Sequence, residues 1–484
     1  MATPSLKEKT AHGLLWGGLS NGVQQVLNLL FGIFLARMLT PDDYGMVGML
    51  LIFSQLATAL QESGFTAALV NQKEIYHDDY NAVFWFSISV SVGMYLILFF
   101  CAPLIANFYD TPELVSLARY QFIGIVLSAL GIAQSAFLFK TLQVKQRAIA
   151  LMVGHVISGI VGVFMAWAGF AYWGIATQNL TYIGVITAIY WYYSPWRPTF
   201  HINLAPIKRM IGFGGKLLIA KILNRVNDNI LTVILGRYYT TNDVGFYNQA
   251  YKWSSMGGYM ITGMTSSVAQ PVLAEVANEK ERQKQVFKKM LGFVAFISFP
   301  VMFGLSFIAE ELICITITDK WLSSVPLMQM LCISGAFVPM TVLCQQLFVS
   351  RGKADIYMWN IILSGIAITI GCLLASPYGI HGMVCIYVGI YIAWFFIWLS
   401  FVWKEINLTL AKACIEIFPF ALTAIVAMEA VQLLTKDIDN IYYTICLKIT
   451  LSAILYVGIL WMTKATMLRE SINYLLHKKI EKDS

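Results

Sequence analysis

Polar breaks divide the chain into fourteen apolar runs of about 20 residues, the length that a helix needs to cross a bilayer. Only 12% of the 484 residues are charged, about half the usual share of a soluble protein, and 58% are hydrophobic. No stretch of mixed composition is long enough for a catalytic domain of ~100–150 residues. The sequence therefore predicts an all-α, polytopic membrane protein with about 14 transmembrane helices. The expected spans are 12–36, 44–68, 82–106, 114–138, 148–168, 171–193, 210–235, 244–271, 287–309, 325–349, 356–376, 378–402, 412–434 and 441–462.

The distribution of lysine and arginine predicts the orientation of these spans. With fourteen spans, the termini share one side with the even-numbered loops, and this side carries 23 of the 33 basic residues. The opposite loops carry only four: Arg37, Arg237, Lys320 and Lys436. Because cytoplasmic loops are enriched in basic residues, both termini are expected in the cytoplasm.

A phrase of eleven residues recurs after an offset of 200 positions. Residues 35–45 read LARMLTPDDYG and residues 235–245 read LGRYYTTNDVG, with five identities. Both phrases end an odd-numbered span and begin the next, as in transporters built from two parallel six-helix repeats. A recurring helix-end phrase would give the same pattern. The expected domains are residues 1–200 (spans 1–6), 201–403 (spans 7–12) and 404–484 (two extra spans and a basic tail).

Charged residues inside spans 7 and 8 form the main candidate site. A charge in the bilayer core costs ~2.5–3.5 kcal/mol or more and usually faces a partner or a water-filled cavity. Lys221, Arg225 and Asp228 share one helical face, and Lys221 lies roughly 18 Å from Arg209, close to mid-membrane. Four bases against one acid favour an anionic ligand such as a diphosphate. The predicted binding residues are Lys216, Lys221, Arg225 and Lys252.

Polar side chains of other spans are expected to line the same cavity. The positions 200 residues before Lys221, Arg225 and Asp228 are also polar. The predicted polar lining consists of Asn21, Gln25, Asn28, Gln55 and Gln249. Asp228 and Glu62 are candidates for coupling transport to H⁺ or Na⁺. An ion pair of Asp228 with Arg225 or Lys221 is the structural alternative.

Glu429 and Lys448 lie at similar depths on spans 13 and 14 and are expected to form a structural ion pair. No cofactor and no metal site are predicted, because the sequence contains no complete nucleotide-binding, zinc-hydrolase or nucleophile-elbow motif. The longest loop on the outer side, residues 310–324, has about fifteen residues. This is too short for the catalytic outer loop that a membrane glycan polymerase or ligase would need.

The phrases GLLWGGLSNGVQQVLNLLFGIFLARMLTPDDYGMVGM (from residue 13) and LGRYYTTNDVGFYNQAYKW (from residue 235) resemble the polysaccharide transporter branch of the multidrug/oligosaccharidyl-lipid/polysaccharide exporter superfamily. The likeness extends over nearly the whole chain and is closest to the colanic-acid and teichuronic-acid type of flippases. It implies a carrier of the bacterial inner membrane that moves undecaprenyl-diphosphate-linked oligosaccharide to the outer leaflet by alternating access. The lipid-linked sugar, the bilayer, and polymerase and chain-length proteins of a glycan pathway are the implied partners. No nucleic acid is expected.

A multidrug cation antiporter of the same superfamily is the main alternative. It would need an acidic cavity with accessible carboxylates, whereas spans 7 and 8 carry mostly bases. The sequence therefore favours the flippase.

Overall fold

The computed structural model describes residues 6–62, 75–200, 203, 205–465 and 467–470, without the side chains of residues 6–15, 17–19, 62, 208–218, 220–221 and 354. Every regular element in these ranges is helical, which confirms the predicted all-α class. The chain divides into two compact units, an N-terminal unit of Met1–Gly245 and a C-terminal unit of Phe246–Ser484. The expected transport domains at 1–200, 201–403 and 404–484 stay a prediction.

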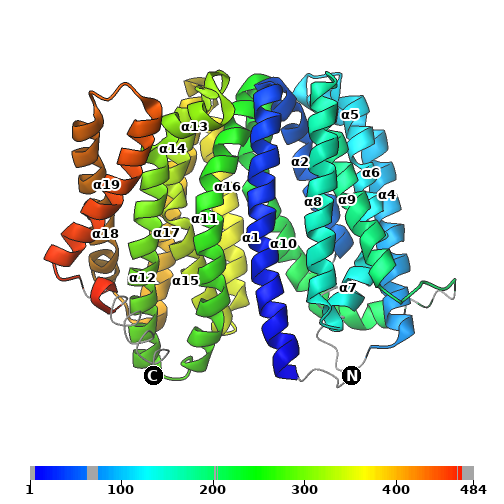
Figure 1. Ribbon diagram of the computed structural model, residues 1–484. Coiled ribbons are helices and arrows are strands. Elements are labelled where there is room, and N and C mark those ends of the chain that lie inside the picture. The colour runs from blue at the N-terminus through cyan, green and yellow to red at the C-terminus, as the bar shows by residue number, and fades with distance from the viewer. Residues whose placement is uncertain (1–5, 63–74, 201–202, 204, 466, 471–484) are drawn as a thin grey trace. The chain divides into compact units, whose positions relative to one another are not determined.

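The N-terminal unit consists of long helices and one chain of short ones (Figure 1). Its helices are α1 (Leu6–Met38), α2 (Pro41–Glu62), α4 (His77–Tyr109), α5 (Leu114–Gln121), α6 (Ile123–Ala129), α7 (Ile132–Lys140), α8 (Val144–Trp167), α9 (Tyr172–Tyr193) and α10 (Ala205–Tyr238). The helix α11 (Thr241–Glu275) begins in this unit and continues into the next.

The C-terminal unit is also built of helices (Figure 1). They are α12 (Lys280–Phe307), α13 (Ala309–Ile317), α14 (Ser324–Gly335), α15 (Val338–Ser350), α16 (Ala354–Ala375), α17 (Gly379–Ile406), α18 (Leu410–Thr435) and α19 (Ile441–Met462), with 3₁₀ turns at Asp319–Trp321 and Ser376–Tyr378.

Within the described residues, each expected span coincides with a helix or with a series of short helices, and residues 63–68 of the second span lie outside this range. Residues 114–138 form α5, α6 and α7, and residues 325–349 form α14 and α15. The expected outer loop 310–324 is instead mostly α13 and a 3₁₀ turn. By length and composition, nine stretches of the described chain could cross a membrane, and one of them, Asp355–Ile406, contains both α16 and α17. The chain is thus a multi-pass membrane protein, and the count of fourteen stays a prediction.

The two copies of the repeated phrase have the same local structure. Thr40 caps α2: its backbone N–H donates to Asp43 Oδ2 at 2.8 Å, and its Oγ1 accepts from the Asp43 N–H at 3.4 Å. Thr240 and Asp243 make the same pair of bonds at the start of α11, both at 3.2 Å. Two orphan N–H groups are satisfied at each helix start, which explains why Thr and Asp recur at this spacing.

Within each unit, helices pack both against their neighbours along the chain and against helices that are distant in the chain. In the N-terminal unit α8 lies between α9 and α1, and α10 contacts α2 and α4. His155 of α8 stacks on Tyr182 of α9, with ring centroids 4.4 Å apart. In the C-terminal unit α12 lies against α18, and α18 pairs with α19 across a short turn (Figure 1).

Candidate functional site

A polar pocket of about 470 Å³ lies between α2 and α10, inside the N-terminal unit. In these mostly apolar helices it gathers side chains that can form hydrogen bonds and carry charge. It is lined by Ser54, Gln55, Thr58, Ala59, Asn224, Arg225 and Asp228.

Helical spacing explains how these side chains meet. Gln55 and Thr58 are three residues apart on α2, and Arg225 and Asp228 are three apart on α10, so each pair shares one helical face. The buried Asn229 joins the two helices: its Nδ2 donates to Gln55 Oε1 at 3.1 Å and to the Arg225 carbonyl at 2.8 Å. Hydrogen bonds of this kind hold membrane helices together in the absence of a hydrophobic driving force between them.

The two charged residues of the pocket are exposed. Among the described residues, no ion pair within 4.0 Å includes Arg225 or Asp228. Charged side chains in mostly apolar helices point to a water-filled cavity or a ligand. The arrangement offers a guanidinium, a carboxylate and an amide to one small volume. It can hold an anion at Arg225 and exchange a cation or proton at Asp228.

Three of the predicted site residues are therefore brought together: Gln55, Arg225 and Asp228. The side chains of three others, Lys216, Lys221 and Glu62, lie outside the described residues, although their backbones belong to α10 and α2.

The remaining predicted residues lie elsewhere. Asn21, Gln25 and Asn28 are exposed on α1 and are not part of the lining of the α2/α10 pocket. Gln249 and Lys252 are on α11 in the C-terminal unit. Gln249 is buried and Lys252 is half-buried. The roles of all these residues stay predictions.

Sequence reasoning missed Ser54, Thr58, Asn224 and Asn229. A signal for them existed, because polar residues cluster on α2 at 54, 55 and 58 and on α10 at 224, 225, 228 and 229. A search for polar residues at helical spacing, rather than for charges, would have found them.

The expected pair of Glu429 and Lys448 is wrong. Lys448 Nζ instead lies 2.6 Å from Glu311 Oε1. Glu311 belongs to α13, a helix that lies where the sequence predicted a loop. The prediction compared only the depths of charged residues within the spans, so it did not consider Glu311 as a partner of Lys448. Glu416 is also paired, with Lys288 at 2.8 Å.

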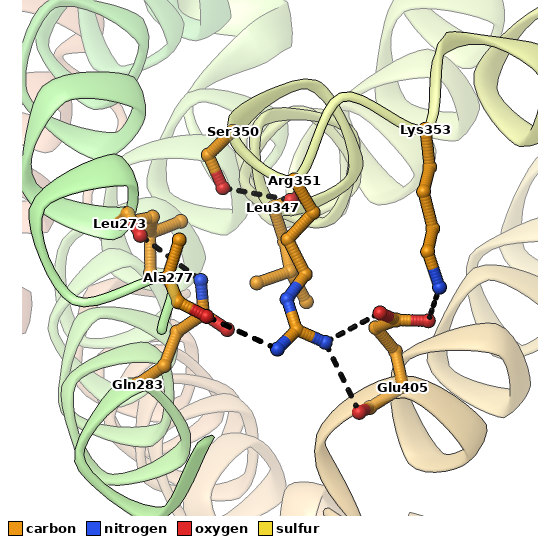
Figure 2. A network of polar contacts seen from close by, with 8 residues as sticks. All are labelled: Leu273, Ala277, Gln283, Leu347, Ser350, Arg351, Lys353 and Glu405. Carbon is orange, nitrogen blue, oxygen red and sulfur yellow. Dashed lines mark hydrogen bonds and ion pairs between the residues drawn. The ribbon is translucent and has the colours of Figure 1, made fainter. Parts of the chain in front are cut away.

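A second polar network joins three segments of the C-terminal unit at the ends of their helices (Figure 2). Arg351, in the turn between α15 and α16, donates to the side chain and the backbone carbonyl of Glu405 and, at 3.2 Å, to the Ala277 carbonyl. Lys353 Nζ lies 2.6 Å from the other oxygen of the Glu405 carboxylate. Because both carboxylate oxygens of Glu405 are held by cations, this network is a structural clasp rather than an open binding site.

The sequence model of a family described as "Polysaccharide biosynthesis protein" matches residues 34–326. The chain belongs to this family. The match includes both copies of the repeated phrase and all the residues that line the α2/α10 pocket.

Curated relatives of this polysaccharide biosynthesis protein come from several bacteria. Lipopolysaccharide biosynthesis protein WzxC of Escherichia coli is 25% identical, and the match covers 78% of each chain. Teichuronic acid biosynthesis protein TuaB of Bacillus subtilis is 26% identical over 76% of each chain. Succinoglycan biosynthesis transport protein ExoT of Rhizobium meliloti is 24% identical over 76% of this chain and 74% of its own.

Solved transporters share the fold. The lipid II flippase MurJ, in an inward closed conformation, has a TM-score of 0.78 over 95% of this chain and all of its own, with 12% identity. An inward-facing multidrug resistance transporter of the MATE family has a TM-score of 0.65 over 79% of this chain and 94% of its own, with 14% identity. At these identities the likeness shows a polytopic transporter fold and no more.

Proposed function

We propose that this protein is a flippase that moves polyprenyl-diphosphate-linked oligosaccharide from the cytoplasmic to the outer leaflet for the synthesis of a surface polysaccharide. Its family and its relatives belong to polysaccharide biosynthesis, and one relative is named as a transport protein. The observation that carries the proposal is the α2/α10 pocket, where Arg225 presents a cation without an ion-pair partner among the described residues.

The chemistry of the ligand fits the site. A diphosphate offers several oxygens to a planar guanidinium, which can bind two of them at once. Lys216 and Lys221, on the same helix as Arg225, would add mobile positive charge, and Lys252 of the C-terminal unit is the fourth cation proposed to bind the ligand. The prenyl chain would stay in the lipid while the head group crosses, as alternating access between two repeats allows.

The proposal also includes an ion that would drive transport and the membrane in which the protein would act. Asp228 and Glu62 would bind H⁺ or Na⁺, and Asp228 lies in the same pocket as Arg225. The protein would act in the bacterial cytoplasmic membrane, with both termini in the cytoplasm, as a carrier and not as an enzyme. Its product would pass to the polymerase and chain-length proteins of the pathway.

The test is flipping of a labelled polyprenyl-diphosphate oligosaccharide in reconstituted vesicles. Arg225→Ala should lower the rate by about tenfold or more, because a charge-assisted hydrogen bond contributes roughly 1.5–3 kcal/mol. Arg225→Lys should keep part of the rate. Arg119→Ala is the matched control, since it removes an arginine of α5 that donates to the Phe99 carbonyl, away from the pocket. Equal rates for wild type and Arg225→Ala would refute the site.

Asp228 in the pocket keeps the cation antiporter as a second candidate, since a carboxylate is what an organic cation would need. Cells that lack or overproduce the protein would then change their sensitivity to cationic drugs. The flippase predicts unchanged sensitivity and a loss of surface polysaccharide on deletion.

A further inference from the structure

The C-terminal unit contains a second polar cavity, of about 610 Å³, near the last turns of α12 and α18. It is separate from the α2/α10 pocket, because every lining residue belongs to the C-terminal unit. Its polar lining includes Glu310, Glu311, Gln329, Glu429, Gln432 and Lys448.

The charges in this cavity do not balance. Lys448 and Glu311 neutralise each other at 2.6 Å, with side chains only 9% and 13% exposed. Glu310 and Glu429 are exposed, and within the described ranges neither has an ion pair. Three carboxylates against one lysine leave a net charge of −2. In a helix bundle bounded by lipid, two uncompensated carboxylates favour a cationic partner.

An apolar hollow continues from the polar cavity along α18. Its volume is about 790 Å³, and it shares Phe303, Ile333 and Ile425 with the polar cavity. It extends to Ile415, and Ile415 and Leu422 are 67% and 63% exposed. The two hollows therefore form one amphipathic crevice that opens on the apolar surface of the unit.

The dimensions of the crevice match a membrane lipid. From Glu429 to Ile415 is fourteen residues of helix, or about 21 Å. One leaflet contributes about 15 Å, half of a ~30 Å hydrocarbon core, and the head group adds a few ångströms. A lipid with its head at Glu429 would thus lay one chain along the whole apolar part.

We propose that this crevice binds a phospholipid whose head group carries an ammonium, such as a phosphatidylethanolamine. The ammonium would lie between Glu310 and Glu429, and the phosphate near Lys448, whose Nζ also lies 4.5 Å from the centre of the Phe307 ring. An anionic phospholipid lacks the ammonium, and a polyprenyl diphosphate adds further negative charge to a site of net −2. The crevice is therefore selective against both, and the inference does not depend on which substrate the protein transports.

Native mass spectrometry of the delipidated full-length protein tests this proposal. The protein is titrated with phosphatidylethanolamine and with phosphatidylglycerol of identical acyl chains. Wild type should bind the ethanolamine lipid more tightly. The double variant Glu310→Gln/Glu429→Gln should weaken that binding by about tenfold and abolish the preference, because it removes the counter-charges of the ammonium.

Three further variants separate the contribution of the lipid head group from that of the acyl chain. Asp110→Asn/Glu113→Gln removes two exposed carboxylates beside α5 in the N-terminal unit and should leave lipid binding unchanged. Leu422→Trp fills the apolar hollow and should weaken both lipids alike. Leu433→Trp, on the same helix but outside the hollow, should weaken neither.

Three results would overturn the proposal. The first is equal affinity of wild type for the two phospholipids. The second is an equal loss of binding in the Asp110/Glu113 control and in the Glu310/Glu429 variant. The third is tight binding of a polyprenyl diphosphate that falls in the Glu310/Glu429 variant, which would make the crevice part of the transport route.

Discussion

Glu405 accepts hydrogen bonds from two cations at once, and its side chain is 12% exposed. Arg351 and Lys353 belong to the turn before α16, whereas Glu405 ends α17, so the carboxylate joins the two ends of this helix pair (Figure 2). Arg351 also donates to Ala277, which extends the clasp to the segment between α11 and α12. Arg351 and Glu405 together thus connect three chain segments.

Neutralising Glu405 should measurably destabilise the C-terminal unit. Glu405→Gln removes the negative charge that the two cations share and replaces one acceptor oxygen by an NH₂ donor, and we expect a loss of about 2 kcal/mol in the free energy of unfolding. Unfolding in detergent, followed by tryptophan fluorescence, measures this loss. Glu279→Gln is the control: its pair with Arg282, at 3.1 Å, joins side chains 58% and 62% exposed, and should cost less than ~0.5 kcal/mol. Similar losses in both variants would contradict the role of the clasp.

At the scale of elements, the starts of α2 and α11 approach each other unusually closely. A Cβ on Gly45 would lie 1.9 Å from the Thr241 carbonyl oxygen, and a Cβ on Gly245 would lie 1.9 Å from that of Pro41. The contact is reciprocal, as two copies of one phrase related by a twofold axis would make it. Glycine recurs in the phrase because only glycine fits against a backbone carbonyl at this distance.

Gly45→Ala and Gly245→Ala should each destabilise the N-terminal unit by about 1–3 kcal/mol, because a backbone carbonyl has to move to admit the methyl group. Thermal unfolding in detergent measures the effect. Gly93→Ala in α4 is the control: apart from the adjacent residues and the backbone of its own helix, no atom lies within 4 Å of its added Cβ, and alanine should be neutral or gain up to about 1 kcal/mol. If both the Gly45 and the Gly245 variant unfold at the same temperature as the wild type, the contact between the starts of α2 and α11 is looser than described.

At the scale of the whole molecule, the distribution of basic residues predicts the orientation, which the helices alone do not reveal. Every loop or tail expected inside, except the loop at 69–81, carries more basic residues than its neighbours outside, so the prediction depends on many loops together. A green fluorescent protein fused after residue 484 should fluoresce, since it folds only in the cytoplasm. Alkaline phosphatase fused after Lys436, in the turn between α18 and α19, should be active outside. The reverse pattern would invert the proposed direction of transport.

Part of the candidate site could be predicted from the sequence. Arg225 and Asp228 stand out because charges are rare in apolar helices, and their spacing places them on one face. Of their neighbours on α2, Gln55 was predicted but Ser54 and Thr58 were not, because serine and threonine are common in membrane helices and carry no charge. Asn229 was missed because its role is a hydrogen bond to Gln55, 174 residues away in the chain.

The all-helical class, the membrane environment and the repeated helix starts at 40–45 and 240–245 follow from the amino-acid sequence alone. These depend on local composition and on short-range spacing, which any segment carries within itself. The partner of Lys448, the helix α13 in place of a loop, the α2/α10 pocket and the crevice along α18 become visible only in the folded chain. These depend on which helices become neighbours, and the packing of side chains distant in the chain settles that choice.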